Sequence, residues 1–276
     1  MSLMSRGTQL IIVTMCLGLT APSAAQTVAQ LSVGQAKIDV VFLSLPPESL
    51  RAMVLNWINA AARAVATYYG HFPVARLEIH VSLYDGFGLD GGQMSDANGK
   101  LITIGVGREC TSDVLARDWI MTHEMVHLSF PSVFKQHHWI EEGLATYVEP
   151  VARARAGELT PEKVWGDMAR DMPQGLPEAG DRGLDYTHTW GRTYWGGALF
   201  CLLADVEIRK RTGNTMGLEH ALRAILQECG RDSADYELAG VLAVGDHAVG
   251  VPVLQELYEK MKAAPVPVDL EKLWKD

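Results

Sequence analysis

The sequence is poor in cysteine. It has four cysteines in 276 residues, and one of them, Cys16, falls within the first 25 residues. The other three, Cys110, Cys201 and Cys229, allow at most one disulfide, so a framework of disulfide bonds is excluded. Cys201 lies in an apolar run, where a buried free thiol is expected. Cys110 with Cys229 is therefore the one pairing to test.

The sequence also lacks an excess of basic residues and, after residue 25, any long apolar run. It carries 24 Lys and Arg against 33 Asp and Glu, a formal charge of −9, which becomes −10 if Arg6 leaves with a cleaved leader. Nucleic acid and anionic lipid are poor partners for such a surface. No segment of the mature chain approaches the roughly 20 uncharged residues that span a bilayer, so no transmembrane segment is expected.

The first 25 residues have the layout of a signal peptide. Arg6 is their only charge, an apolar stretch covers residues 10–19, and small residues precede a cleavage site after Ala25. Lipid attachment at Cys16 is disfavoured, because Met15 is a poor small-residue position. We therefore expect an exported protein, periplasmic or secreted, whose remaining 251 residues can bury a full core.

The periodicity of the apolar residues changes near residue 108. Before it, the pattern predicts strands at 37–45 and 77–83, an amphipathic helix at 48–69 and a hairpin at 92–106 that follows a glycine-rich loop. After it, helices are predicted at 112–129, 139–156, 192–212, 216–229, 233–244 and 251–263, with a long loop over a cleft at 157–188. The sequence thus predicts an α+β fold in one domain, 26–276. A sheet-bearing lobe (26–108) and a helical lobe (109–276) would enclose the cleft.

The stretch His123-Glu124-Met125-Val126-His127 points to a metal site. On a helix, residues four apart lie on the same face, so both imidazoles can reach one Zn²⁺ at about 2.0–2.1 Å. Glu124 lies beside that face, where a carboxylate can act as general base towards a metal-bound water. The alternative is a surface helix with solvated histidines.

A catalytic zinc site needs a third protein ligand and an open fourth position. A third histidine of the metzincin type is disfavoured, because Phe130 occupies the position where that pattern requires glycine. His137 and His138 are therefore expected in the loop or at the cleft rim, although either would serve as a fourth ligand of a purely structural zinc. Glu141 and Glu142 point about 100° apart, so only one can face the metal. The residues alone leave five candidates: His137, His138, Glu141, Glu142 and Glu149.

The segment from Trp139 to Tyr147 resembles the W-x-x-E-G-x-A-x-Y segment of gluzincin zinc metallopeptidases, and is most similar to the peptidase MA-like group and the relatives of glycyl-aminopeptidase. The resemblance implies a thermolysin-like bilobal domain in which Glu142 is the third ligand of one zinc ion. The stretch from Thr193 to Leu199 resembles a helix of the same families whose tyrosine stabilises the oxyanion. It implies this role for Tyr194. His188, from the preceding loop, could be a second donor to the same oxyanion.

Several nearby residues have less specific expected roles. Glu141, Asp118 or Asp205 could accept a hydrogen bond from a ligand histidine. Four tryptophans are expected in the core or in the cleft walls: Trp119, Trp139, Trp190 and Trp195.

One departure from the family pattern limits the expected activity. Aminopeptidase relatives carry an acidic residue on an edge strand beside the metal, and the corresponding Gly91-Gly92-Gln93-Met94-Ser95 has none. The resemblance therefore implies a zinc metallopeptidase that acts on peptides or proteins, either an endopeptidase or a peptidase with an unusual substrate, and not an aminopeptidase. The layout of residues 1–25 adds the expectation that it is exported. The competing hypothesis is a module on the same fold that binds a peptide or protein without cleaving it; the intact Glu124 argues against it.

Overall fold

The chain forms one five-stranded sheet and a set of helices. The computed structural model describes residues 27–96, 99–230 and 236–275. The α+β class predicted from the sequence is confirmed. The strand order is β1-β2-β3-β5-β4, with β2, β3 and β5 parallel and both edge strands antiparallel to their neighbours. The strands are β1 (Thr27–Val33), β2 (Ala36–Phe42), β3 (Arg76–Tyr84), β4 (Leu89–Ser95) and β5 (Leu101–Gly107).

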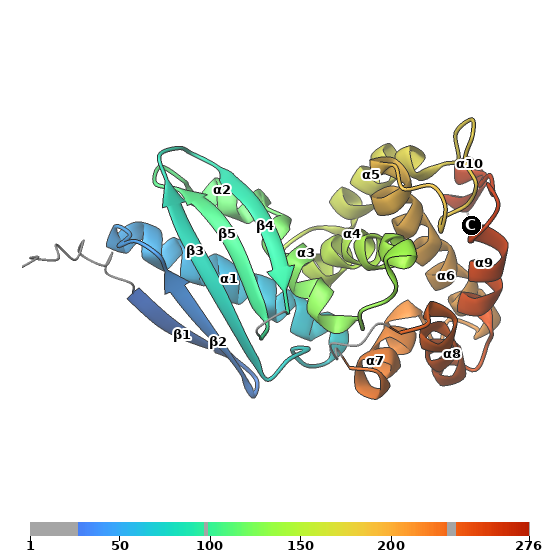
Figure 1. Ribbon diagram of the computed structural model, residues 1–276, viewed down its shortest axis with the longest axis horizontal. Coiled ribbons are helices and arrows are strands. Elements are labelled where there is room, and N and C mark those ends of the chain that lie inside the picture. Colours follow the sequence, from blue (N-terminus) through green and yellow to red (C-terminus); the bar gives the residue numbers. More distant parts are fainter. Residues whose placement is uncertain (1–26, 97–98, 231–235, 276) are drawn as a thin grey trace, which may run out of the picture.

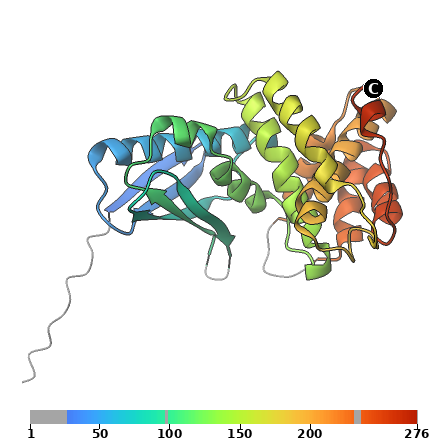
Figure 2. The same cartoon turned by 90° about the horizontal axis from the view of Figure 1, so that it is seen from above.

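One face of the sheet is covered by helix α1 (Glu48–Tyr69), whose bounds agree with the predicted helix. Alternate residues of the central strands are buried on this face, among them Ile38, Ile79 and Ile104. Figure 2 shows α1 and the short helix α2 (Ser112–Arg117) on the same side of the strands. The alternation of buried and exposed residues thus follows from a sheet with one apolar face.

The remaining helices follow in the second half of the chain. Figure 1 shows α3 between the sheet and the helical part. In the described residues, no helix is long and apolar enough to cross a membrane. The bounds are α3 (Ile120–Val126), α4 (His138–Arg155), α5 (Pro161–Asp171), α6 (Gly197–Arg211), α7 (Leu218–Glu228), α8 (Leu238–Val249), α9 (Val253–Met261) and α10 (Leu270–Leu273).

The single helix predicted over residues 112–129 is broken into two. Asp118 ends α2 in an extended conformation, and its carboxylate accepts hydrogen bonds from the N–H groups of Ile120 and Met121. These bonds cap the start of α3, which turns into a 3₁₀ turn at His127–Ser129. The break at Asp118 therefore gives α3 its own direction, independent of α2.

The segment 157–188 was predicted to be a loop, but it contains helix α5. The prediction is therefore wrong over the length of that helix. Thr160 caps the helix through its hydroxyl, which accepts from the N–H of Lys163, and Pro161 occupies the first turn. Val164 and Met168 are buried one turn apart. The sequence Thr160-Pro161 is an ordinary helix start. The loop was predicted because the glycines and prolines further along the segment were given more weight than this signal.

Other differences are smaller. Strand β1 and helix α10 were not predicted, and helix α8 runs later than the predicted helix at 233–244, of which residues 233–235 lie outside the described residues. The segment 1–25, with Cys16, also lies outside them. The pairing of Cys110 with Cys229 is wrong, because both cysteines are free, whereas Cys201 is a buried free thiol as expected.

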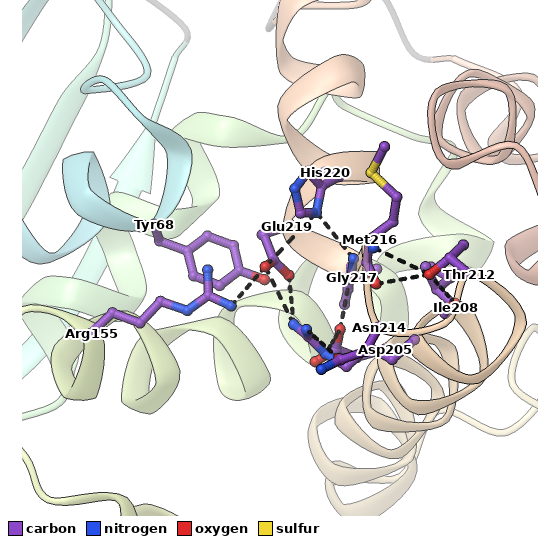
Figure 3. Close-up of polar contacts among 12 residues, drawn as sticks. Tyr68, Arg155, Asp205, Ile208, Thr212, Asn214, Met216, Gly217, Glu219 and His220 are labelled. Atoms are coloured by element: carbon purple, nitrogen blue, oxygen red, sulfur yellow. Dashed lines mark hydrogen bonds and ion pairs between the residues drawn. The ribbon is translucent and has the colours of Figure 1, made fainter.

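A polar network ties the C-terminal helices to the centre of the fold (Figure 3). Glu219, at the start of α7, accepts from Arg209 of α6 at 3.0 Å and from Arg155 at the end of α4 at 3.0 Å. Asp205 accepts from Tyr147 and from the N–H of Leu218. Burial alone would raise the pKa of Glu219, but its own backbone N–H and the two arginines hold the pKa below its usual value.

We expect the substitution Glu219→Gln to lower the free energy of unfolding at pH 7 by about 1–3 kcal/mol, because it removes a carboxylate that is buried and bonded to two cations. The folded-state pKa lies below the unfolded value of 4.5, so this stabilisation is complete above that pH and is lost as the pH falls through the folded-state pKa. Urea unfolding at a series of pH values checks this. Glu207→Gln, in an exposed pair with Arg211, is the control and should cost under about 0.5 kcal/mol. A gap between wild type and Glu219→Gln that stays constant down to pH 3 would contradict the account.

Candidate metal centre and cleft

Helix α3 carries His123, and His127 begins the 3₁₀ turn that continues the helix. Apolar residues on its other faces, including Met121 and Met125, are fully buried and fix the helix against the core. The ring centroids of His123 and His127 lie 4.9 Å apart, in line with the prediction that both rings share one face, and the ring planes are nearly perpendicular. Both imidazoles therefore point to the same side of α3.

Helix α4 brings Glu142 to the two histidines. Its Oε2 lies 3.2 Å from Nε2 of His123 and 3.6 Å from Nε2 of His127. One candidate ligand atom from each of the three residues lies within 4.8 Å of the others. Ligands at about 2.0–2.1 Å from a tetrahedral ion lie about 3.3–3.4 Å apart, so this donor set fits Zn²⁺. Burial alone would raise the pKa of Glu142, but His123, His127 and His138 hold the pKa below its usual value, which keeps the carboxylate ionised.

Two glycines let α4 and α6 approach closely at this point. A Cβ on Gly143 would lie 2.3 Å from the backbone of Gly197, and a Cβ on Gly197 would lie 2.2 Å from the carbonyl oxygen of Trp139. Gly143 directly follows Glu142, and Gly197 follows the turn that carries Tyr194. The close contact between the two glycines therefore determines how near the side chains of Glu142 and Tyr194 can come to each other.

We expect Gly143→Ala to lower the free energy of unfolding by about 1–3 kcal/mol, because the added methyl group meets backbone atoms that cannot rotate away. Gly166→Ala is the matched control. Gly166 is an exposed helical glycine with open space around its Cβ position, so alanine there should be neutral or stabilise by up to about 1 kcal/mol. Equal unfolding midpoints for the two variants in urea would show that the contact is unimportant.

Glu124 is buried and held by the edge strand of the sheet. Its Oε2 accepts a hydrogen bond of 2.8 Å from the N–H of Met94 in β4. Gly92, in the same strand, makes room for this, since a Cβ there would lie 2.1 Å from Ile120 and 3.2 Å from Glu124. Burial raises the pKa of Glu124, while His123 and the Met94 N–H reduce the effect. A raised pKa suits a carboxylate that takes up a proton during a reaction.

Tyr194 lines the same cavity as Glu124 and belongs to a π-helical turn (Arg192–Gly196) that precedes α6. Its ring is stacked on His123, with centroids 6.2 Å apart, and on Trp190, with centroids 5.6 Å apart. Burial, and then the Glu142 carboxylate, raise the pKa of Tyr194 to about 12. The hydroxyl therefore stays protonated at neutral pH and can donate a hydrogen bond into the cleft.

The other two histidines considered as ligands are placed differently. His138 is at the rim as predicted, with Nε2 3.3 Å from Oε1 of Glu142 and Nδ1 3.4 Å from Glu141. His137 lies in the connection between α3 and α4, the loop alternative of the prediction, and does not line the cleft. It is buried and bonded to Asp185, which also accepts from the indole N–H of Trp139. His137 thus helps to hold the start of α4 in place.

The predicted supporting carboxylates have identified partners of their own. Asp118 caps α3, Asp205 belongs to the network around Glu219, and Glu141 lies against His138. Glu149 is buried and paired with Arg153 at 2.9 Å. His188 is exposed and does not line the cleft, so the structure gives no support to its role as an oxyanion donor.

The three candidate ligands, Glu124 and Tyr194 line one cavity of about 550 Å³. Strand β4 forms one wall, as predicted for the segment 91–95, and no acidic side chain projects from that segment. Sequence reasoning did not identify Ile120 or the backbone N–H of Met94, because both enter the site only through the packing of α3 on β4. The lining residues are Gly91, Gly92, Gln93, Met94, Trp119, Ile120, His123, Glu124, His127, His138, Glu141, Glu142 and Tyr194.

Comparison with known proteins places the fold. No protein-family model and no curated protein matches the sequence. Among solved structures, an aminopeptidase N family protein from Idiomarina loihiensis is 12% identical with a TM-score of 0.63, and the match covers 91% of this chain and 49% of that one. An M1 zinc metallopeptidase from Deinococcus radiodurans is 17% identical with a TM-score of 0.52 over 89% of this chain and 54% of that one. A mutant of the latter with bound Tyr-ser-ala substrate is 16% identical, with a TM-score of 0.54 over 88% of this chain and 53% of that one.

The solved structures that this chain resembles are thus zinc metallopeptidases of the M1 type, which are gluzincins. The predicted resemblance to gluzincins is confirmed at the level of the fold. The chain spans about half the length of these structures.

Proposed function

We propose that this chain is a gluzincin-type zinc metallopeptidase domain of thermolysin-like bilobal arrangement, which hydrolyses peptide bonds in an open cleft. One observation carries the proposal. His123, His127 and Glu142 direct one ligand atom each to a common point, and Glu124, bonded to the edge strand, lies beside them in the same cavity. The M1 fold of the solved structures supports it.

The three ligands would hold one Zn²⁺ and leave a fourth position open. When bound, the ion supplies Lewis acidity, which lowers the pKa of a water and polarises a carbonyl. Glu124 takes the proton of the attacking water and passes it to the leaving amine. Tyr194 donates its hydroxyl proton in a hydrogen bond to the oxygen that becomes negatively charged.

The residues of strand β4 that face the cleft distinguish between an aminopeptidase and a peptidase that cleaves within a chain. Its segment 91–95 faces the cleft and has no carboxylate that could bind a free amino terminus. An extended peptide main chain can still lie along such an edge. We therefore propose cleavage within a chain, or of an unusual substrate, rather than removal of amino-terminal residues. The competing function is peptide or protein binding without cleavage; a buried Glu124 held in place beside the ligands favours the hydrolase.

Export is part of the proposal. The layout of residues 1–25 supports a cleaved signal peptide and a periplasmic or secreted enzyme. Amino-terminal sequencing of the protein recovered from outside the cytoplasm should give Gln26 as the first residue. Recovery of the intact amino terminus from the cytoplasm alone would argue against export.

We expect removal of the metal to abolish hydrolysis reversibly. Dialysis against a chelator should leave a folded protein that cleaves no peptide in a mixed pool, and one equivalent of Zn²⁺ should restore cleavage. We expect the fold to survive because the ligand-bearing helices are held by buried apolar residues such as Met121, Met125 and Trp139. Mass spectrometry of the pool gives the cleaved bonds and circular dichroism gives the fold. Cleavage that survives in protein shown to be free of metal would refute a zinc-dependent reaction.

A further inference from the structure

The turn that carries Tyr194 begins at a buried ion pair. Nε of Arg192, the first residue of the turn, lies 2.7 Å from Oδ2 of Asp181, and the two side chains are 4% and 1% exposed. Neither of them lines the cavity of the metal centre. Because a buried ion pair gives up the hydration of both charges, its net contribution to stability is small. Stability alone therefore does not explain why the pair lies at this turn.

The turn rests directly on an earlier part of the chain. A Cβ on Gly175 would collide with the backbone of Trp195, and a Cβ on Gly191 would collide with the carbonyl oxygen of Gln174. Gln174 and Gly175 belong to one short 3₁₀ turn. Nη1 of Arg192 donates a hydrogen bond to the carbonyl oxygen of Gly175. The arginine thus joins the start of the π-helical turn to the backbone on which that turn rests.

Asp181, the partner of this arginine, is itself held in place. Its Oδ1 accepts from the N–H of Gly183 at 2.8 Å. The N–H groups of Leu184 and Asp185 bond to carbonyl oxygens at the end of α9. The Asp185 carboxylate also accepts from the indole N–H of Trp139 in α4, at 2.8 Å. Two helices of the core therefore hold this short segment, and Asp181 is a fixed point for the ion pair.

The ring of Tyr194 needs a support of this kind. It is stacked on His123 and on Trp190, and Trp190 is 60% exposed, so that stack is a weak constraint. A donor to an oxyanion must lie within about 2.7–3.1 Å of it, so a small displacement of the turn would lose the hydrogen bond. Arg192 lies two residues before Tyr194 and can fix the backbone that carries it.

We propose that Arg192, paired with Asp181, is a positioning residue, which holds the turn so that the Tyr194 hydroxyl meets the oxyanion of the reaction. The inference rests on the proposed function, which gives Tyr194 that role. Arg192 does not line the cleft, so it acts only through Tyr194. Loss of the ion pair should therefore displace the tyrosine ring, and it should cost no further activity once the hydroxyl has been removed.

Nuclear magnetic resonance on metal-free protein tests the position of the ring without any measurement of activity. With tyrosine labelled with ¹³C at the ε carbons, the signal of Tyr194 is the one that disappears in Tyr194→Phe. The neighbouring aromatic rings move this signal away from that of free tyrosine. Asp181→Asn keeps the size of the side chain and an acceptor for the Gly183 N–H, but removes the charge that faces Arg192. It should shift the signal towards the free-tyrosine value.

Two further variants complete this test. Removing one partner of a buried pair leaves an unpaired charge, so Asp181→Asn alone could fail to fold. The double variant Arg192→Met/Asp181→Asn leaves no buried charge and should show the same shift. Glu219→Gln is the control, because it breaks another buried ion pair away from this turn and should leave the Tyr194 signal unchanged. A Tyr194 signal that stays at its wild-type position in the folded double variant would overturn the inference.

A double-mutant cycle on the zinc-loaded protein tests whether the pair acts through Tyr194. Tyr194→Phe should lower kcat by about 10²- to 10³-fold, the loss for one oxyanion donor. Asp181→Asn should lower kcat by at least about 10-fold in wild type, but by under about 2-fold in the Tyr194→Phe background. Glu219→Gln should keep kcat within about 3-fold in both backgrounds.

The cycle and the tyrosine signal fail in different ways. Losses of kcat that multiply in the double variant would show that the ion pair does not act through Tyr194, and would overturn the inference. A zinc-loaded wild type that cleaves no peptide would refute the proposed function instead. The tyrosine signal would then still decide whether the ion pair holds the ring of Tyr194.

Discussion

The substitution Glu124→Gln is expected to lower kcat for peptide hydrolysis by about 10²- to 10⁴-fold while one zinc stays bound, because a proton acceptor positioned at the attacking water accounts for that much of the rate. Glutamine keeps the shape of the side chain. Its amide can still meet the Met94 N–H through its oxygen, so the position of strand β4 should not change. The loss should therefore fall on kcat, with the zinc content unchanged.

Glu141→Gln is the matched control for this variant. Glu141 is an acid on the same cavity wall, bonded to His138 rather than to the strand. It should keep kcat within about 3-fold, since it is not placed to accept the proton of the attacking water. Kinetics on one cleaved peptide, with zinc measured in the same samples, decide the point. If Glu124→Gln loses no more activity than Glu141→Gln, Glu124 is not the general base.

Glu142→Gln is expected to weaken zinc binding by more than about 100-fold, because a neutral amide oxygen replaces an ionised carboxylate in the coordination sphere. Burial alone would raise the pKa of Glu142, but His123, His127 and His138 hold it below its usual value, so the side chain is an ionised carboxylate that can bind a cation. Competition with a fluorescent zinc chelator gives the affinity, and hydrolysis at limiting zinc should fall in parallel.

Two further variants separate the ligand from its neighbours. Glu141→Gln and His138→Asn alter residues that border Glu142 on the rim, and neither should change zinc affinity by more than about 10-fold. A loss of affinity in His138→Asn as large as that in Glu142→Gln would mean that His138 is a fourth ligand. The site would then be structural, with no open position.

The parts of the fold that sequence patterns predicted are those with a strong local signal. The bounds of α1 were correct because its apolar residues recur on one face over six turns, and the β4–β5 hairpin was identified by its alternation and by the turn residues around Gly99. The break at Asp118 was missed because an acid within a helical pattern reads as a solvated residue. Only the packed structure shows its carboxylate capping the next helix.

The features of the candidate site also differ in how strongly the local sequence predicts them. The spacing of His123 and His127 on one helix is a local property, and the structure places both imidazoles on one side of α3. The position of Glu142 next to them required the resemblance to gluzincins, because nothing in the spacing distinguishes it from Glu141. The bond between Glu124 and Met94 joins residues 30 positions apart and depends on how α3 packs against β4, which no pattern in the sequence encodes.

The central claim is that His123, His127 and Glu142 hold a zinc ion with an open position. The most direct test is the X-ray absorption spectrum at the zinc edge of protein loaded with one equivalent of Zn²⁺, with and without acetohydroxamate. The account predicts only nitrogen and oxygen neighbours at about 2.0–2.2 Å, two of them imidazoles, and a change in the spectrum when the hydroxamate binds. A sulfur neighbour at about 2.3 Å, or a spectrum that the hydroxamate leaves unchanged, would contradict it.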